Sequence, residues 1–547
     1  MKNVTLLELY FLPPMAMARL GNSDTPLEAF AWEEDARIHS ACRTVIRPRI
    51  SFRVRSDGSL EPYLPEEIQF KDDGKIRPAA PFFELWADVL VDSQGFQQVP
   101  VTLDLLNSLG VSLEKHLLIH AHAANTKASR RVKDPSCSFA ARVTIRGGDF
   151  SQHHLLASSP SFPERESLVY HDAPIPLGHV QLIRPVSENS MEQDLSVVRV
   201  RFTPAKGEVY GPANASAGSV SPLEPGRQLS YASIAARTHE IVPEQNRILN
   251  PNTPWSQYVM DTGKADDPQP SDSYDGANVG NSICWGVVDD TCEIVLKAEL
   301  TVKGQRFTAS TRAFVAPPDY APDRRPFFSM ADELADRELP PVEINDATAE
   351  VTAEEIHDLF KRIFETTNLL NLDASRDYLI RENLKRAPLD QWQSAPHIGR
   401  EGMTRADKPL ARLSSDILND GLNGKPNVGH SRLPYTDLSE HAHGSFTSLD
   451  YLILFMKTRG DRLKQMIRPP FGSFAQLPVE PLAEPHPDFR DPRVFRDTLH
   501  DMRMPPYMRD SDREPLSLTR RQYTMLMDYL TFLQQQEASV QSHQSDS

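Results

Sequence analysis

Over roughly the first 335 residues, hydrophobic and polar positions alternate in short runs with the period of two that β-strands show. The runs are rich in β-branched residues and cover residues 4–12, 43–54, 82–92, 116–122 and 197–202. The clearest hairpin joins residues 293–302 to residues 305–314 through Lys303 and Gly304, a connection short enough for a tight turn. The pattern predicts a β-rich N-terminal domain over residues 1–335, built as a sandwich of antiparallel strands.

The strand pattern lapses between residues 204 and 280. Pro212 and Pro268 each stand among Gly, Asn or Asp residues, which break regular structure. We expect this stretch to be a long loop excursion from the N-terminal domain, because it is too often interrupted by proline to form a domain of its own.

Helical spacing takes over beyond residue 336. Thr352 and Glu355 have the spacing of a capping box and precede a stripe with helical period. The stripe consists of Ile356, Leu359, Phe360 and Ile363. Further helices are predicted over residues 447–457 and 519–535, the second with a capping box of Thr519 and Gln522. We expect a mainly α-helical domain over residues 336–536, a disordered tail at 537–547, and an α+β fold.

Charge and hydropathy narrow the classes of partner. The 547 residues include 59 Lys+Arg and 75 Asp+Glu, a formal charge of −16 without a basic run, which argues against nucleic acid. No run approaches the roughly 18 apolar residues of a membrane span. Residues 4–12 imitate a secretion signal, but Glu8 interrupts the run and Pro13 ends it. We therefore expect a cytoplasmic protein that contacts no membrane.

The cysteines are too few for a disulfide scaffold at this length. They are Cys42, Cys137, Cys284 and Cys292, and no two of them form a CxxC pair. Residues 285–291 could form a turn that brings Cys284 and Cys292 together in a disulfide. In a reducing compartment they would instead be two half-buried thiols, and the sequence leaves both possibilities open.

Two histidine pairs are candidate metal ligands, His120 with His122 and His441 with His443. Residues i and i+2 of a strand share a face, so His120 and His122 could offer two imidazoles to one metal ion. A metal site needs further ligands, and no His or carboxylate follows at a telling spacing. The alternative is that one strand face simply carries two polar residues.

Other motifs have ordinary structural explanations. His153 and His154, Asp289 and Asp290, and the acidic run 332–338 are each interpreted as solvated faces or turns. Signatures of dinucleotide, P-loop, hydrolase and zinc-protease sites are missing. The sequence therefore assigns no catalytic and no cofactor-binding residue.

Several motifs, in this order, resemble the LodA-like family of lysine ε-oxidases and glycine oxidases. They are residues 18–23 (ARLGNS), 70–82 (FKDDGKIRPAAPF), 313–322 (AFVAPPDYAP), 503–509 (RMPPYMR) and 516–519 (LSLT). The family uses cysteine tryptophylquinone, a cofactor made from one cysteine and one tryptophan of the chain itself. Because the motifs supply turns and extended exits, they argue for a shared fold more than for a shared activity.

The resemblance fails where the family builds its quinone. In the family both quinone residues follow the helix that matches residues 519–535, whereas here the last cysteine is Cys292 and the last tryptophan is Trp392. The resemblance therefore implies a chain truncated before the quinone segment. We expect no tryptophylquinone and no other cofactor.

Two hypotheses for function follow from the resemblance and its failure. The first is a non-quinone family member with a binding, structural or accessory role, which associates with a protein partner or with itself through the truncated helical part. The alternative is an oxidoreductase of the amine or amino-acid oxidase type, similar to L-lysine 6-oxidase, that uses another cofactor or a partner chain.

Overall fold

The computed structural model describes residues 4–35, 44–92, 94–213, 242–257, 286–319, 321–327, 329–369, 449–467 and 518–545. The chain divides into two compact units. The first comprises Met1–Ala31 and Arg47–Tyr320, and the second comprises Trp32–Ile46 and Ala321–Ser547. The sequence predicts the end of the first domain at residue 335. It does not predict that the segment Trp32–Ile46 belongs to the helical unit. The α+β fold class is confirmed.

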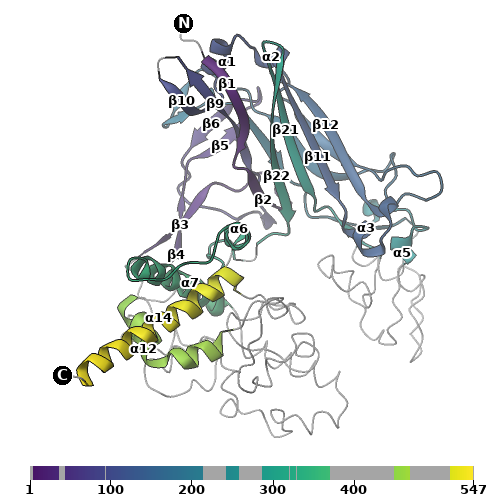
Figure 1. The fold of residues 1–547 in the computed structure, drawn as a ribbon. Helices are drawn as coiled ribbons and strands as arrows, with labels where there is room; N and C mark the ends of the chain where they lie inside the picture. The colour runs from purple at the N-terminus through teal and green to yellow at the C-terminus, as the bar shows by residue number, and fades with distance from the viewer. Residues whose placement is uncertain are drawn as a thin grey trace, which may run out of the picture. The chain divides into compact units, whose positions relative to one another are not determined.

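The first unit contains a six-stranded antiparallel sheet with the path β1-β9-β17-β14-β13, in which β10 also pairs with β9 (Figure 1). Its strands are β1 (Val4–Leu12), β9 (Phe82–Val91), β10 (Gly95–Pro100), β13 (Gln152–Ala157), β14 (Ile175–Leu182) and β17 (Arg199–Thr203). The first predicted strand, residues 4–12, is thus observed with the bounds that the alternation gave.

A second sheet of five strands has the order β12-β11-β21-β22-β2. Its strands are β2 (Met15–Arg19), β11 (Leu117–Asn125), β12 (Phe139–Arg146), β21 (Glu293–Val302) and β22 (Gln305–Ala316). The predicted hairpin is present as β21 and β22. The edge strand β2 runs parallel to β22, where the sequence predicted antiparallel strands alone. This pairing joins strands almost 300 residues apart in the chain, so no local pattern signals it.

The core of the first unit lies between these two sheets. Along β9, β11 and β21, and along β22 from Ala309 onward, every second residue is buried, as the period of two predicts. One continuous cluster of buried side chains includes Phe83 and Leu85 of the first sheet and Ile119 and Leu296 of the second. Each such side chain contributes about 1.5–3 kcal/mol when it leaves water. The sandwich is therefore held by the alternation itself.

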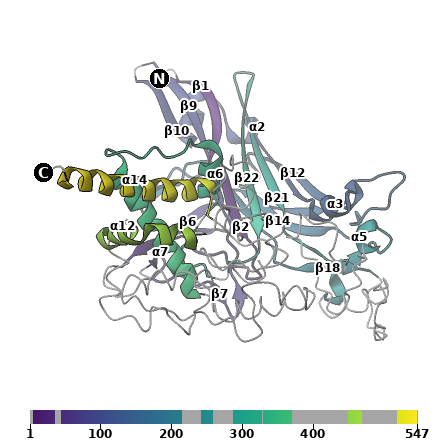
Figure 2. The same cartoon turned by 60° about the horizontal axis from the view of Figure 1, so that its bottom comes forward.

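Shorter elements complete the first unit. They are β5 (Ser51–Val54), β6 (Leu60–Tyr63), β7 (Lys71–Asp72), β8 (Lys75–Ile76), α1 (Leu103–Leu109), α2 (Leu113–His116), α3 (Lys127–Val132), η1 (Pro135–Cys137), β15 (Asn189–Ser190), β16 (Gln193–Asp194), η2 (Glu244–Asn246) and α5 (Pro254–Gln257). The predicted loop excursion at 204–280 is described in part. A small sheet of β19 (Arg247–Leu249), β18 (Val209–Pro212) and β20 (Val288–Asp289) anchors it, and α3, α5 and β18 lie at one end of the sandwich (Figure 2).

The second unit is mainly helical. Its described helices are α6 (Met330–Glu338), α7 (Ala349–Leu369), α12 (Leu449–Met466) and α14 (Arg520–Ser545). The predicted stripe of α7 is buried in one cluster with Leu452 of α12 and Leu526 of α14. α14 continues to Ser545, within the part for which the sequence predicted a disordered tail. None of the described helices is long and apolar enough to cross a membrane.

One of the two predicted capping boxes is confirmed and the other is wrong. At α14 the Thr519 N–H donates to Gln522 Oε1 at 3.0 Å, and the Gln522 N–H donates to Thr519 Oγ1 at 3.2 Å. α7 instead begins at Ala349, and Thr352 lies inside the helix with its hydroxyl donating to the Thr348 carbonyl. A threonine in the first turn can satisfy a carbonyl as readily as an N–H, so the spacing alone misplaced the cap.

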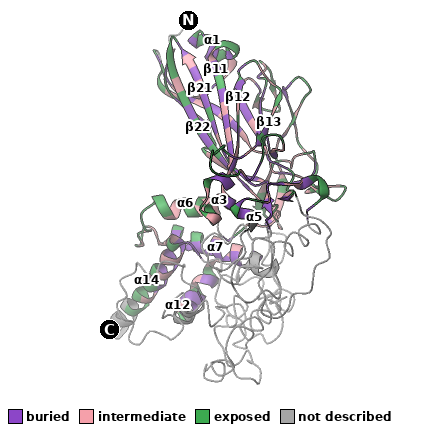
Figure 3. Ribbon diagram, turned by 90° about the vertical axis from the view of Figure 1, so that its right-hand side faces the viewer, coloured by how far each residue is buried: buried purple, intermediate pink, exposed green. Residues whose placement is uncertain are grey.

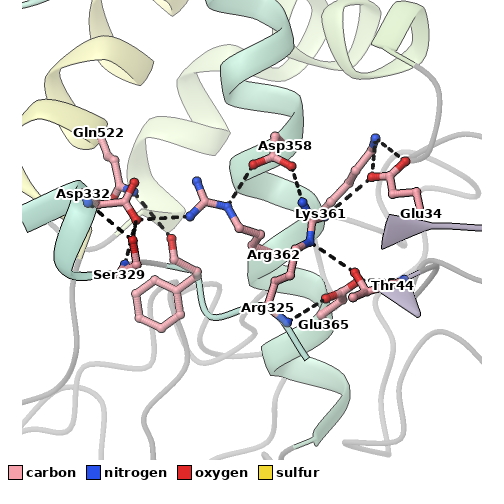
Figure 4. Close-up of polar contacts among 11 residues, drawn as sticks. Glu34, Thr44, Arg325, Ser329, Asp332, Asp358, Lys361, Arg362, Glu365 and Gln522 are labelled. Carbon is pink, nitrogen blue, oxygen red and sulfur yellow. Dashed lines mark hydrogen bonds and ion pairs between the residues drawn. The ribbon is translucent and has the colours of Figure 1, made fainter. Parts of the chain in front are cut away.

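A polar network fastens the N-terminal segment to α7 within the second unit (Figure 4). Two-stranded pairing joins β3 (Phe30–Glu34) to β4 (Thr44–Pro48). The buried Glu365 carboxylate accepts hydrogen bonds from both the N–H and the hydroxyl of Thr44, and the Arg325 N–H donates to its other oxygen at 3.4 Å. Glu34 accepts from Lys361 Nζ at 2.9 Å. α7 thus holds both strands of the segment.

We predict that Glu365→Ala releases this segment from α7. The substitution leaves the Thr44 N–H without its buried acceptor, which costs about 1–3 kcal/mol. Amide hydrogen exchange at Thr44 and Val45 should therefore accelerate by at least about tenfold. Glu354→Ala is the matched control, because Glu354 is an exposed residue of the same helix and the gain in helix propensity is the same. Equal exchange in both variants would contradict the prediction.

Candidate functional site

His120 and His122 lie side by side on the outer face of β11, as the alternation along a strand requires. The alternating residues Ile119, Ala121 and Ala123 point into the core. His120 stands opposite Thr144 of β12 and Lys297 of β21, and His122 stands opposite Arg142 and Val295. Figure 3 shows the alternation of buried and more exposed positions along these strands.

The polar contacts of His120 involve neighbouring strands. Its Nδ1 lies 3.0 Å from Thr144 Oγ1, and its Nε2 lies 3.8 Å from Glu299 Oε1. Glu299 also accepts a hydrogen bond of 2.7 Å from Lys297 Nζ, and this bond is the main reason why its pKa is lowered. The Glu299 carboxylate therefore lies close to both His120 and Lys297.

His122 has a different environment. Burial lowers its pKa, and the nearby Arg142 guanidinium lowers it further, so the imidazole is neutral at physiological pH. Residues paired across neighbouring strands form a row. In the row of His122, Val295 comes next and is followed by Arg312 of β22. Neighbouring strands are about 4.8 Å apart, so Arg142 and Arg312 lie about 14 Å from each other along this row.

Five exposed cations share this outer surface with the two histidines. They are Arg142, Arg146, Lys297, Arg306 and Arg312, and we call this surface the basic face. Two carboxylates, Glu293 and Glu299, point to the same side. The surface therefore carries a local excess of positive charge in a chain whose formal charge is −16.

The basic face suits an anion better than the metal ion that the sequence suggested. No set of three or more His, Cys, Asp or Glu side chains arranged to hold a metal ion occurs within the described residues. Arg142 and Lys297 flank the two imidazoles, and their charge opposes the approach of a metal cation. Metal binding by His120 and His122 stays a prediction, whereas the surrounding charges favour a negatively charged partner.

The remaining histidine and acidic motifs are dispersed. His153 Nε2 lies 3.0 Å from Asp149, and His154 packs against His179 with ring centroids 5.7 Å apart. The acidic run 332–338 falls in α6, where Asp332 forms a capping box with Ser329. His441 and His443 lie outside the described residues.

The described cysteines are buried thiols. The Cys292 thiol faces the Leu177 carbonyl oxygen at 3.8 Å, and that of Cys137 bonds to the backbone of Trp255. Burial raises the pKa of both thiols. Cys137 also has a side-chain hydrogen bond with Ser136. Cys42 and Cys284 lie outside the described residues, so the proposed disulfide is not tested.

Asp290 is a buried carboxyl group that sequence reasoning missed. It follows β20, and its Oδ2 accepts hydrogen bonds from the N–H groups of Gly207 and Glu208 at 3.0 and 2.9 Å. Its Oδ1 is buried and has no hydrogen-bond partner in the part of the chain that the structure describes. Asp290 thus fastens the exposed turn that leads into β18.

The environment of Asp290 stabilises its neutral form. Burial raises its pKa to about 7, and the charge of Asp289 adds to the rise, while the two backbone hydrogen bonds oppose it. Asp289 itself is partly exposed and is paired with Lys127 Nζ at 3.0 Å. The alternation of β21 does not signal this burial, because Asp290 lies before the strand and Thr291 and Cys292 are both buried beside it.

Among solved structures, this chain is similar to the ε-lysine oxidase from Marinomonas mediterranea, with 15% sequence identity and a TM-score of 0.32. The likeness covers 62% of this chain and 41% of the length of that protein. No family model matches the sequence, and no curated protein matches it either. At this level the likeness assigns neither fold nor activity.

We predict that Asp290 makes the first unit less stable as the pH rises. Its folded pKa near 7 exceeds the unfolded value near 4, so the folded state holds a proton that the unfolded state releases. The stabilisation is complete below about pH 4 and is lost as the pH rises through 7. Between pH 5 and pH 8 the loss is on the order of 2 kcal/mol.

Urea unfolding across this range measures the effect. Asp290→Asn should remove this part of the pH dependence, because an amide does not titrate. Asp92→Asn, at an exposed position of the same unit, should keep the pH profile of the unsubstituted protein. Parallel profiles for Asp290→Asn and the unsubstituted protein would show that Asp290 does not titrate near neutrality.

Proposed function

We propose that this chain is a binding protein that docks an acidic segment of a partner protein on its basic face. The observation that carries the proposal is the gathering of five exposed cations on one sheet surface of a chain with a formal charge of −16. Exposed charges are screened within about 8–10 Å at physiological salt. The local excess of cations therefore governs what approaches this surface, despite the acidic character of the whole chain.

The composition of the basic face favours a protein over a nucleic acid. Apolar side chains interrupt the cations, with Leu118 36% and Met17 38% exposed and Val295 partly buried. Protein interfaces combine arginine with such apolar contacts. A run of phosphates would also meet the carboxylates of Glu293 and Glu299, whereas side chains of a protein segment can be spaced to avoid them.

A binding role agrees with the first hypothesis drawn from the sequence, a family member that makes no quinone of its own. The burial of the free Cys137 and Cys292 thiols, which raises their pKa values and lowers their reactivity, supports it. Association through the helical unit remains a separate expectation, because it would involve other surfaces.

We predict that charge reversal on the basic face weakens binding of an acidic peptide. In fluorescence anisotropy at physiological salt, a labelled poly-glutamate peptide should bind the double variant Arg142→Glu, Arg312→Glu at least about tenfold more weakly than the unsubstituted chain. The affinity of the unsubstituted chain should fall as salt is added.

The control is a double variant with the same change of net charge. Arg337→Glu, Arg520→Glu reverses two exposed arginines of the helical unit and should bind the peptide as the unsubstituted chain does. Equal weakening in both double variants would mean that only net charge matters. Tighter binding of a single-stranded oligonucleotide than of the peptide would overturn the choice of a protein partner.

We also predict that the purified chain has its unmodified mass and gives no quinone redox-cycling stain. A tryptophylquinone needs oxygen inserted into an indole ring that is bonded to a cysteine sulfur, and both described thiols are buried free cysteines with raised pKa values. Intact-mass spectrometry and a peroxide assay with L-lysine check the prediction. A Cys–Trp linked peptide, together with peroxide release, would restore the oxidase alternative.

A further inference from the structure

Arg201 is a cation that has no acidic partner among the described residues. It lies on β17, on the outer side of the six-stranded sheet, with its guanidinium 4.7 Å from the centroid of the Phe82 ring. Its Nε is buried and has no hydrogen-bond partner within the described residues. The ion pairs of these residues include Arg199 but not Arg201. Burial lowers its pKa to about 10, so the group is still charged at neutral pH.

Arg199, on the same strand, is an arginine whose charge is paired within the fold. It precedes Arg201 by two residues, so both side chains leave the same side of β17. Arg199 Nε donates to Glu84 Oε1 at 2.8 Å, and its NH1 donates to the Asp194 carbonyl at 2.8 Å. Both arginines stack on a phenylalanine, but within the described residues only Arg199 has a carboxylate partner.

The surroundings of Arg201 supply neutral polar groups. His179 lies on the adjacent strand β14, and His154 of β13 stands opposite it in register. Burial lowers the pKa of His179 to about 4, with His154 and Arg201 as further causes, so its ring is neutral. The phenol of Tyr63 approaches Arg201 from β6. Among the described residues, no acidic side chain is a cause of the shift in the Arg201 pKa.

We propose that Arg201 is the anchor of a second binding site, which takes the oxyanion of a small ligand, a carboxylate or a phosphate. A partly desolvated charge that lacks a partner is costly, and an oxyanion would offset that cost. A planar guanidinium can offer parallel N–H groups to two oxygens, and the Phe82 ring, 4.7 Å away, covers one of its faces. His179 and Tyr63 border the site, and His154 packs against His179.

This site is separate from the basic face, because it lies on the other sheet. Inorganic phosphate and acetate are the probes, which distinguish the two classes of oxyanion. Each is titrated into the full chain while the imidazole proton signals of the histidines are followed by NMR. The bound anion cancels the charge of Arg201, so the His179 pKa should rise when the anion is present.

Arg201→Gln should abolish the anion-dependent rise of the His179 pKa and weaken binding at least about tenfold. Arg201→Lys keeps the charge but loses the paired N–H groups, so it should bind with intermediate affinity. Arg337→Gln, at an exposed arginine of the helical unit, should behave as the unsubstituted chain. Unchanged dispersion of the other histidine signals shows that each variant is folded.

The outcomes separate clearly. A response to phosphate but not acetate assigns a phosphate ligand, and a response to acetate but not phosphate assigns a carboxylate. If neither anion shifts His154 or His179 in the unsubstituted chain, or if Arg201→Gln responds as the unsubstituted chain does, the site is overturned. Because the readout is local to these histidines, anions that bind elsewhere on the protein do not imitate the result.

Discussion

Burial of one face of each sheet against the other is the constraint on which the rest of the first unit depends. It fixes the parity of every long strand, because a shift of one residue would send the whole hydrophobic set of that strand into water. Once Ile119 and Leu296 must face inward, His122 and Lys297 must face outward. The basic face is thus a consequence of core packing together with the choice of residues at the remaining positions.

The same constraint explains how much of the fold the sequence could predict. The alternation of β1 and of the hairpin β21–β22, and the helical stripe of α7, are local patterns with one stable solution each. The parallel pairing of β2 with β22 and the attachment of residues 32–46 to the helical unit join distant parts of the chain. Their energy comes from contacts such as Thr44 with Glu365, which no spacing along the chain reveals.

Prediction of the site fails for a related reason. The sequence predicts the histidine pair. It does not predict the charged residues around the pair, because they come from other strands. Arg142 and Lys297 reach His122 and His120 only through the register of β12 and β21. Asp290 was misjudged as solvated because acidic pairs usually lie in turns, and the alternation that would reveal its burial begins only at β21. The sign of each charge can be read from the sequence, but the residues that lie beside it depend on how the strands pair.

Three buried or half-buried ions of the first unit then differ in how their charge is compensated. Arg199 has a carboxylate and a carbonyl within 2.8 Å and needs nothing further. Asp290 has two backbone donors for one oxygen, and its raised pKa lets a proton remove the charge that is left. The charge of Arg201 is compensated in neither way. A guanidinium does not release its proton at neutral pH, and no described anion pairs with it. An ion that the fold neither pairs nor neutralises is most simply explained by a partner from solution.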